Sequence, residues 1–417
     1  MFQAFRNRNI GLLFGAQFVS VAGDLVLFVA LPFWIYQLTG SAMATGFMFA
    51  ALTIPQLLIS PIAGVFVDRW DRKRLMIVSD LLRAGLVMCY LFVHTAEQVW
   101  IIYMIAFAEA AVSQFFRPSV MAVMPTLANG EEELTRANAA LGASYAVGKL
   151  AGPALGGLLV ASFGPHAAAL FDAATYLISA LLVLFIHVPP RDQVVTKLTD
   201  ARQAVAEISR ELLQGVRVVL DRPILRVLFA SLAVLLLSQG IINVLLVVLI
   251  QDIWNVGAQE FGWLISAEGI GGILGTFVVG ALATRVSAKN LIVAGGVIAG
   301  MLFLIVVNQP SVYVAMGLFA IAGITIIAFD VGLTTLLQLG SDDANRGRVS
   351  GLMQTVMAAS QLISIAATSL LADRLGAPLM LNIAGACFIL GGLVALLTPR
   401  LNVSESTTTT ATTQPAQ

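Results

Sequence analysis

The chain has 417 residues, of which 59% are hydrophobic and only 11% are charged, and its formal net charge is zero. Soluble domains carry about 25% charged residues, so most of this chain is predicted to lie in lipid rather than in water. The zero net charge and the lack of a long basic block argue against a nucleic-acid partner. Cys89 and Cys387 lie far apart in apolar stretches, which predicts neither a disulfide framework nor a metal site.

Twelve apolar stretches are long enough to cross a membrane as helices of about 20 residues. The first begins near Ile10 and is too long to be the core of a cleavable signal. An even number of spans places both termini on the same side of the membrane. The spans are predicted near residues 10–36, 44–67, 75–94, 98–122, 138–161, 166–187, 224–250, 260–283, 290–308, 311–338, 348–371 and 378–398.

Basic residues gather in the loops on one side of the predicted membrane, whereas the opposite loops hold one basic residue, Arg374. Because cytoplasmic loops carry the excess of lysine and arginine, we predict that the basic side is cytoplasmic. The protein is therefore expected in the inner or plasma membrane of a bacterial cell, as a multi-pass protein with both termini in the cytoplasm. The basic loops contain Arg6, Arg8, Arg69, Arg72, Lys73, Arg74, Arg136, the residues from Arg191 to Arg226, Arg285, Lys289, Arg346, Arg348 and Arg400.

Four regions follow from this pattern. Residues 1–188 and 224–400 form an N-terminal and a C-terminal six-helix bundle, and the polar tail 401–417 is predicted to be disordered. Residues 189–223 form a cytoplasmic linker in which apolar residues recur at helical spacing. This linker is predicted to hold an amphipathic helix on the inner membrane surface, although a plain tether is also compatible with it. The apolar positions are Val205, Ile208, Leu212, Val216 and Val219.

The two halves of the chain repeat each other. Residues 136–164 align without gaps on residues 348–376, and Gly46, Gly64 and Arg69 match Gly262, Gly280 and Arg285 at a constant offset. Both repeats begin on the cytoplasmic side, so they run parallel. The predicted fold is an all-α membrane protein of twelve transmembrane helices, with two parallel six-helix repeats around a central cavity.

The loop after the second span reads GVFVDRWDRKR over residues 64–74. It resembles the loop signature of the major facilitator superfamily, with Asp71 in place of the usual second glycine. Residues 80–83 (DLLR), 116–118 (FRP) and 207–228 resemble the drug:proton antiporter branch typified by macrolide-efflux permeases. The resemblance extends from Phe5 to about Arg400 and implies the major facilitator fold.

The resemblance also implies a conformational latch in this loop. Gly64 would let its helix approach a neighbour closely, and Asp68 would face the positive N-terminus of a helix that begins near Arg346 in the other half. Asp80 and Arg83, one turn apart, are expected to hold the basic loop in place. For the basic residues, the alternative is that they only fix the topology. The latch set is Gly64, Asp68, Arg69, Arg72, Asp80 and Arg83.

The fifth span contains GKLAGPALGG at residues 148–157, which resembles the signature of exporters in this family. The glycines at every fourth position form one stripe that permits close contact with another helix, and the proline permits a bend. The counterpart stripe in the second half, Ser360, Ser364 and Thr368, has neither glycine nor proline. The predicted antiporter hinge consists of Gly148, Gly152, Pro153, Gly156 and Gly157.

Charges inside the spans are costly unless they are paired, hydrated or neutralised, so each needs a reason. Asp24, Glu109 and Lys149 lie in three different spans of the first half, and we predict that they converge on the central cavity. There, with Gln17 and Arg117, they would bind substrate or couple transport to protons. A permanent ion pair with Lys149 or Arg117 is the alternative. Two further acids, Asp172 and Glu268, are expected near the outer ends, where solvation is easy.

The chain has no nucleotide-binding loop, zinc signature or nucleophile elbow in a suitable context, so it is not expected to be an enzyme or to need a cofactor. The family resemblance implies a secondary active transporter that exports small amphipathic or hydrophobic compounds, such as macrolide-like drugs, by proton antiport with alternating access. A proton gradient would supply the energy. The expected partners are a small-molecule cargo, protons and lipids, and the protein is expected to be a monomer.

Two alternatives stay open. One is a dedicated exporter or flippase for a siderophore or a lysophospholipid, which the same branch includes. The other is a receptor or scaffold that uses the transporter fold without transporting anything. The hinge glycines and the charges within the spans argue against the second alternative, because a scaffold needs neither.

Overall fold

The computed structural model describes residues 7–60, 63, 67, 70–188 and 201–399. Long apolar runs with capping residues at their ends make this part of the chain helical, and no strand occurs in it. The first half contains α1 (Arg8–Thr39), α2 (Ala42–Leu58), α4 (Arg72–Met88), α5 (Val99–Leu127), α6 (Glu131–Phe163) and α7 (Pro165–Leu184). The second half contains α9 (Pro223–Val248), α10 (Ala258–Leu282), α11 (Ala288–Asn308), α12 (Val312–Gly340), α13 (Asp343–Leu375) and α14 (Ala377–Val394).

Eleven of the helices in the described part are long and apolar enough to cross a membrane. The remaining apolar helix, α2, has 17 described residues and occupies the start of the second predicted span. The prediction of an all-α fold with twelve spanning segments is therefore confirmed, with the C-terminal part of the second span mostly outside the described residues.

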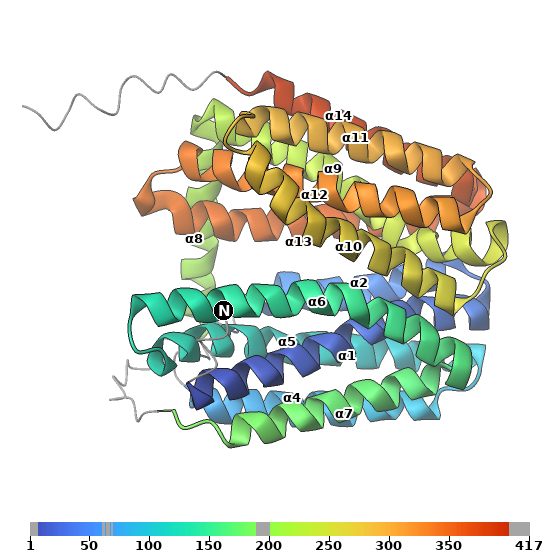
Figure 1. Ribbon diagram of the computed structural model, residues 1–417, viewed down its shortest axis with the longest axis horizontal. Coiled ribbons are helices and arrows are strands. Elements are labelled where there is room, and N and C mark those ends of the chain that lie inside the picture. Colours follow the sequence, from blue (N-terminus) through green and yellow to red (C-terminus); the bar gives the residue numbers. More distant parts are fainter. Residues whose placement is uncertain (1–6, 61–62, 64–66, 68–69, 189–200, 400–417) are drawn as a thin grey trace, which may run out of the picture.

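The two halves have the same internal arrangement, which confirms the repeat. In the first half α1 packs against α6 and α7, and in the second half α9 packs in the same way against α13 and α14 (Figure 1). The joints at the helix ends also correspond. The Asn7 side chain donates to the carbonyl of Leu127 over 2.8 Å, and Arg222 donates to the carbonyl of Gly340 over 2.7 Å.

The halves are joined mainly by two pairs of helices, α6 with α10 and α2 with α13 (Figure 1). At one end of the molecule a single core of buried apolar side chains spans both halves, including Val26, Ile35 and Tyr36 of α1 and Val244 and Val247 of α9. At the other end each half has a separate core, one around Ile10 and Phe116 and one around Leu228 and Phe329. The halves are thus sealed together at one end and apart at the other.

Polar contacts also join the halves at the sealed end. The Tyr36 hydroxyl, at the end of α1, donates to the carboxylate of Asp252, which lies in the one-turn π-helix Leu249–Ile253 after α9. The Gln251 amide donates to the carbonyl of Phe33 over 3.1 Å. Both contacts join residues of the first half to residues of the second.

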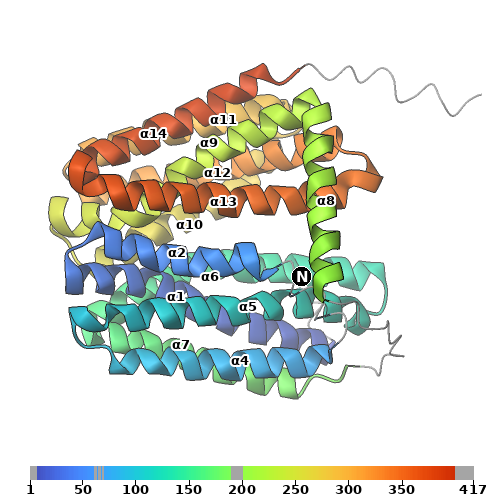
Figure 2. The same cartoon turned by 180° about the vertical axis from the view of Figure 1, so that it is seen from behind.

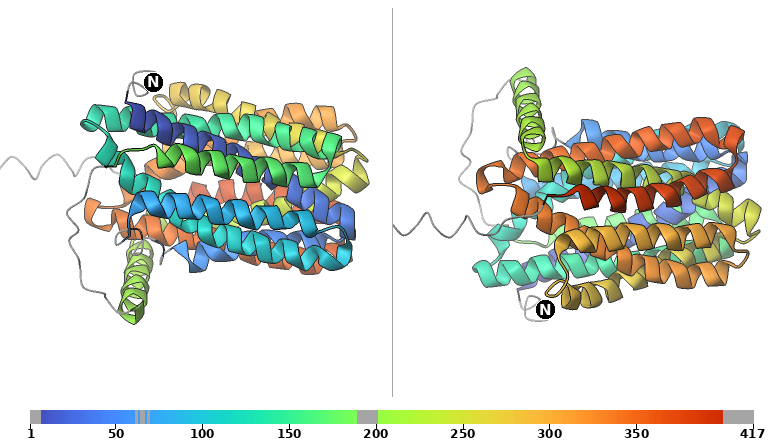
Figure 3. Two further views of the ribbon diagram at one scale, coloured as in Figure 1. Left: turned by 90° about the horizontal axis from the view of Figure 1, so that it is seen from below. Right: turned by 90° about the horizontal axis from the view of Figure 1, so that it is seen from above.

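A helix also forms in the predicted linker: α8 (Ala201–Asp221) runs across the end of the molecule where the halves are separate, transverse to the other helices (Figures 2 and 3). It packs on α13 and α9, and its Val219 belongs to the second half's core. Leu213 and Leu220 on the same helix are exposed. The side chains of Val205 and Ile208 lie outside the described residues.

Candidate transport site

A cavity of about 850 Å³ opens between the halves at the end that carries α8. Its walls come from α2 and α5 of the first half, α13 of the second half, and α8. This is the region where the two halves have separate cores. The lining includes Gln56, Ser60, Ser113, Gln114, Arg117, Glu211, Arg348, Gln354, Thr355 and Gln361.

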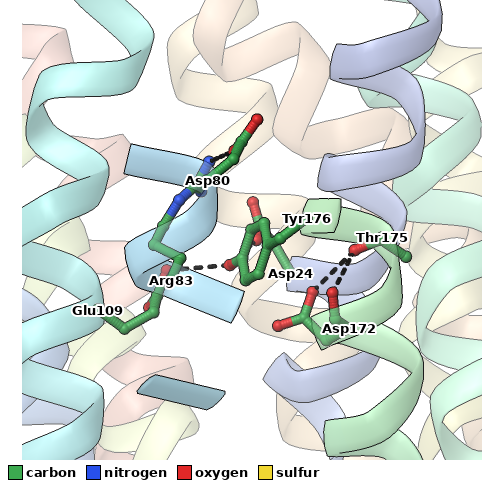
Figure 4. Close-up of polar contacts among 7 residues, drawn as sticks. All are labelled: Asp24, Asp80, Arg83, Glu109, Asp172, Thr175 and Tyr176. Atoms are coloured by element: carbon green, nitrogen blue, oxygen red, sulfur yellow. Dashed lines mark hydrogen bonds and ion pairs between the residues drawn. The ribbon is translucent and has the colours of Figure 1, made fainter. Parts of the chain in front are cut away.

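A cluster of ionisable side chains lies inside the first half (Figure 4). At its centre is Tyr176 of α7, whose hydroxyl lies 2.6 Å from a carboxylate oxygen of Asp24 on α1 and 3.0 Å from one of Glu109 on α5. The Tyr176 side chain is buried, Glu109 is half-buried and Asp24 keeps an exposed surface. Two of the predicted coupling residues therefore meet, through a tyrosine that the sequence did not single out.

Both contacts of the Tyr176 hydroxyl can be hydrogen bonds only if one of the two acids carries a proton. A phenol has one proton to donate and an oxygen that accepts. If Tyr176 donates to Asp24, its contact with Glu109 is a hydrogen bond only when Glu109 is the protonated partner, and the converse also holds. The three side chains can therefore share protons over short distances.

The rest of the cluster surrounds one buried guanidinium. Arg83 of α4 bonds the Asp80 carboxylate over 2.5 Å, and its guanidinium carbon lies 4.7 Å from the centre of the Phe116 ring and 4.2 Å from that of Tyr176. Cation–π contacts of this kind favour a buried cation. Asp80 and Arg83, assigned from the sequence to the latch and to the basic loop, therefore contact the ionisable cluster.

Asp172 of α7 is also part of this cluster, and its predicted place in a solvated outer region is wrong. The side chain is fully buried. The hydroxyl of Thr175 lies 2.7 Å from the carbonyl oxygen of Asp172 and 3.1 Å from one of its carboxylate oxygens. The other carboxylate oxygen has no hydrogen-bond partner among the described residues. The absence of a side chain at Gly23 lets α1 approach Asp172 and Thr175 closely. Helix packing, rather than position along the span, decides the solvation of Asp172.

Lys149 does not join Asp24 and Glu109, so the predicted convergence of all three is wrong. Its ammonium group bonds the Glu268 carboxylate on α10 over 2.8 Å, across the two halves. Both side chains are partly exposed, at 38% and 23%. Lys149 directly follows Gly148, which belongs to the glycine stripe that faces α1. The Lys149 side chain therefore points toward α10. Glu268, predicted near an outer end, thus has a charged partner.

Arg117 lines the cavity, as predicted for this set. Gln17 is half-buried on α1, seven residues before Asp24, and its side chain makes no hydrogen bond within the described part of the chain. The predicted coupling set is thus divided between the cluster, the seam and the cavity.

The predicted hinge residues form two contact surfaces on α6. The stripe of Gly148, Gly152 and Gly156 lies against Val21, Leu25 and Val26 of α1. Gly157 and the carbonyl of Pro153 instead face the other half, against Ala258 and Gly262 of α10. A side-chain carbon on Gly262 would come within 2.2 Å of the Pro153 carbonyl oxygen. The same motif therefore serves both the bundle and the seam between the halves.

Three of the predicted latch residues, Gly64, Asp68 and Arg69, lie outside the described residues, so the latch stays a prediction. The neighbouring basic residues hold helix ends in place: Arg72 donates to the carbonyl of Ala122 and Lys73 to that of Leu184, each over 2.7 Å. Asp71, which replaces the second glycine of the motif, caps α4 by accepting from the Arg74 amide over 2.8 Å.

The sequence did not indicate Tyr176 or Arg348 as residues of this site, and it did not indicate the ion pair between Glu268 and Lys149. Tyr176 lies one turn after Asp172 on α7, which is the only signal that would have drawn attention to it. Arg348 was assigned to the topology of the basic loops, although it lines the cavity. Both roles depend on which helices become neighbours.

Comparison with known proteins supports this assignment of the fold. The family model of the Major Facilitator Superfamily matches residues 13–238 and 228–416. Macrolide efflux protein A of Streptococcus pyogenes is 25% identical over 398 residues, which cover 94% of this chain and 95% of the relative. Multidrug efflux pump Tap of Mycolicibacterium fortuitum is 26% identical over 408 residues, with the same two coverages. An uncharacterized MFS-type transporter of Bacillus subtilis, YfiS, is 24% identical over 99% of both chains.

Among solved structures, a bacterial homologue of the iron transporter ferroportin in an inward-facing state matches 94% of this chain and 99% of its own. The TM-score is 0.75 at 17% sequence identity, which is a likeness of fold. The named relatives are transporters, in agreement with the prediction that the chain is not an enzyme. The chain belongs to the Major Facilitator Superfamily.

Proposed function

We propose that this protein exports small amphipathic or hydrophobic compounds, of the drug or macrolide-like kind, in exchange for protons. The relatives named as a macrolide efflux protein and a multidrug efflux pump support the direction and the kind of cargo. The observation that carries the proton coupling is the Tyr176 hydroxyl, which lies within hydrogen-bonding distance of both Asp24 and Glu109.

The charge balance of the cluster supports this role. If Asp24, Asp80, Glu109 and Asp172 were all ionised, Arg83 would leave three negative charges uncompensated in the interior of the bundle. Such charges are too costly inside a membrane protein to persist without protons. Because the Tyr176 hydroxyl lies between Asp24 and Glu109, a proton would pass from one acid to the other through Tyr176.

The two unlike ends of the molecule support alternating access. The cavity opens at the end that carries α8, and the other end is sealed by a common core and by the contact of Tyr36 with Asp252. By the positive-inside rule the open end faces the cytoplasm, with both termini on that side. Cargo would enter there, and a rocking of the halves would open the sealed end while the cluster releases or gains a proton.

The proposal is tested with the purified full-length protein in proteoliposomes under an imposed pH gradient. A panel of amphipathic compounds, including a macrolide, is screened for cargo transport and for coupled proton movement. Glu109→Gln and Asp24→Asn are expected to abolish transport driven by the gradient while they retain cargo binding, because each variant is fixed in a neutral state. The matched control is Glu260→Gln, an acid near the start of α10 that lies far in sequence from the cluster.

Two results would contradict the proposal. If the wild-type protein moved no compound of the panel and no protons, secondary active export would be excluded for this cargo class. If gradient-driven transport in both acid variants equalled that of the wild type, the cluster would not carry the coupling proton.

A further inference from the structure

The charged side chains that line the cavity are mainly cationic, and each half supplies one of the cations. Arg117 comes from α5 and Arg348 from α13, whereas the only carboxylate among the described lining residues is Glu211 of α8. The other polar lining groups are neutral amides and hydroxyls. Apolar side chains, among them Leu57, Met121 and Met357, complete the wall.

No described carboxylate neutralises either guanidinium. Within the described part of the chain, Arg117 has no hydrogen-bond or ion-pair partner. Arg348 has only a neutral one, the amide oxygen of Asn345 at 3.2 Å. No ion pair among the described residues joins Glu211 to either arginine. Elsewhere the pattern differs, because Arg83 and Arg222 both bind carboxylates.

The positions equivalent to Arg117 and Arg348 in the opposite repeat do not line the cavity, so the repeat does not itself require two lining cations. The position equivalent to Arg117 in the second half is Asp330, and it is not among the lining residues. The first half thus places a cation where the second half has an acid. Arg348 begins the repeat segment 348–376, whose first-half equivalent, Arg136, bonds Glu132 and lies outside the cavity wall.

We propose that the cavity selects amphipathic cargo with an anionic group, a carboxylate or a phosphate, which Arg117 and Arg348 bind from opposite halves. This inference rests on the proposed function and names the charge of its cargo. The guanidinium fork matches the oxygens of either anion. The glutamines and hydroxyls bind other polar groups, and Leu57, Met121 and Met357 contact the apolar part.

The assignment also has an electrical consequence. An anion that leaves a cell with an inside-negative potential moves in the favourable direction, as does a proton that enters. Exchange of a monoanion for one proton would therefore draw on the membrane potential through both charges.

The test is a binding measurement with the full-length protein in nanodiscs of uncharged lipid at neutral pH. The probes are 11-(dansylamino)undecanoic acid, its methyl ester and a dansyl-alkylamine of similar length, which differ in head-group charge. The carboxylate is expected to bind at least about tenfold more tightly than the ester, as one charge-assisted hydrogen bond provides. Arg117→Gln and Arg348→Gln should each weaken the carboxylate about tenfold and leave the ester unchanged.

Two further variants separate charge from folding. Arg117→Lys keeps the cation and should restore most of the affinity for the carboxylate. Arg285→Gln removes an exposed arginine that does not line the cavity, so it should bind all three probes like the wild type. The inference is overturned if the ester or the amine binds as tightly as the carboxylate, or if neither arginine variant changes binding.

Competition by dodecyl phosphate and by dodecanoate then distinguishes the two anions, and stronger displacement by either one supports the inference. Transport assays in proteoliposomes distinguish failure of this inference from failure of the proposed function. If neutral or cationic compounds exchange for protons while anions do not bind, the anion inference fails and the exporter remains. If no compound is transported, the proposed function fails.

Discussion

The hydroxyl of Tyr176 is the contact that turns two separate acids into one site. Asp24 and Glu109 come from helices that are far apart in sequence, and each is within hydrogen-bonding distance of the same oxygen. The ring of Tyr176 also lies over the Arg83 guanidinium. The hydroxyl and the ring therefore have different tasks, and a substitution can separate them.

Tyr176→Phe is expected to keep the fold and impair coupling. The ring and its contact with Arg83 remain, but the hydrogen bond to a charged acid, worth about 1.5–3 kcal/mol, is lost. Gradient-driven transport should fall about tenfold or more, while exchange without a gradient persists. Both rates are measured in proteoliposomes. The control is Tyr103→Phe, a half-buried tyrosine of α5 whose hydroxyl has no partner in the described part. Equal losses in both variants would contradict the assignment.

The pair of Arg222 with Asp342 predicts a dependence of stability on pH. The hydrogen bond and the charge of Arg222 lower the pKa of Asp342 below its usual 3.8. A lowered pKa in the folded state means that the stabilisation is present above the usual pKa and is lost as the pH falls through the folded value. Asp342→Asn should therefore lower the midpoint of thermal unfolding slightly at pH 7, because both side chains are partly solvated.

The difference between Asp342→Asn and the wild type should be constant above pH ~5 and shrink toward lower pH. Differential scanning fluorimetry across this range measures it. The control variant is Asp221→Asn, at an exposed acid at the end of α8 with no ion pair in the described region. A difference that grew as the solution became more acidic would show that the sign is wrong.

At the scale of residues, the sequence located the ionisable groups better than their partners. Asp24 and Glu109 are conspicuous because charges within apolar spans are rare. Their common neighbour Tyr176 is not, because tyrosine in a span has many uses. The partner of Lys149 could not be found either, since Glu268 reaches it only through the seam between the halves. Pairing of this kind depends on three-dimensional neighbours.

At the scale of helices, the two repeats place their glycines on different members of the equivalent helix pair. In the first half the glycines lie on α6 and α1 supplies the larger side chains. In the second half the glycine, Gly240, lies on α9, and Ser364 of α13 contacts it and donates to the carbonyl of Leu237. Sequence alone showed that the α6 stripe was missing from α13. It did not show that in the second half the glycine at this contact lies on α9.

The seam between α6 and α10 predicts the effect of one methyl group. In Gly262→Ala the added carbon meets the backbone of Pro153 and Gly157, and such overpacking costs about 1–3 kcal/mol. Because the cost falls on the state with a closed seam, the population should shift about tenfold or more toward the opposite state. Transport should fall accordingly. Gly280→Ala is the control on the same helix, because nothing lies within 4 Å of the added carbon.

The shift is measured by labelling Ala258→Cys, a buried position at the seam, with a membrane-impermeant maleimide after Cys89 and Cys387 have been replaced by serine. Labelling should be slow in the parent and about tenfold faster with Gly262→Ala. Equal rates in the parent, Gly262→Ala and Gly280→Ala would show that the close contact does not hold the seam shut.

At the scale of the whole molecule, the apolar core divides the two ends. One shared core closes one end, and two separate cores leave room for the cavity at the other. Composition and span counting predicted the fold and the repeat, because both follow from apolar runs of fixed length. They could not predict which end is open, since two states with the same helices differ only in how the halves meet.

The open end predicts a difference in accessibility from the two sides of the membrane. In the cysteine-free parent, Gln354→Cys in the cavity should react with an impermeant maleimide in inside-out vesicles. Ala258→Cys should react with the same reagent from the outside at a rate about tenfold or more lower than that of Gln354→Cys. The reason is that only a minor, outward-open population exposes residue 258. A cargo and a pH gradient that drive turnover should change the two rates in opposite directions. Labelling of Gln354→Cys from the outside alone would reverse the predicted topology.

The transverse helix α8 packs on α13 and α9, so it would move with the second half if the halves rock as proposed. Its exposed leucines, Leu213 and Leu220, and the arginines Arg210 and Arg217 beside them suit the boundary between acyl chains and headgroups. Each transport cycle would then drag this helix through the lipid surface. Membranes rich in acidic phospholipid would bind the arginines of α8 more tightly. The turnover rate would then depend on the lipid composition as well as on the cargo.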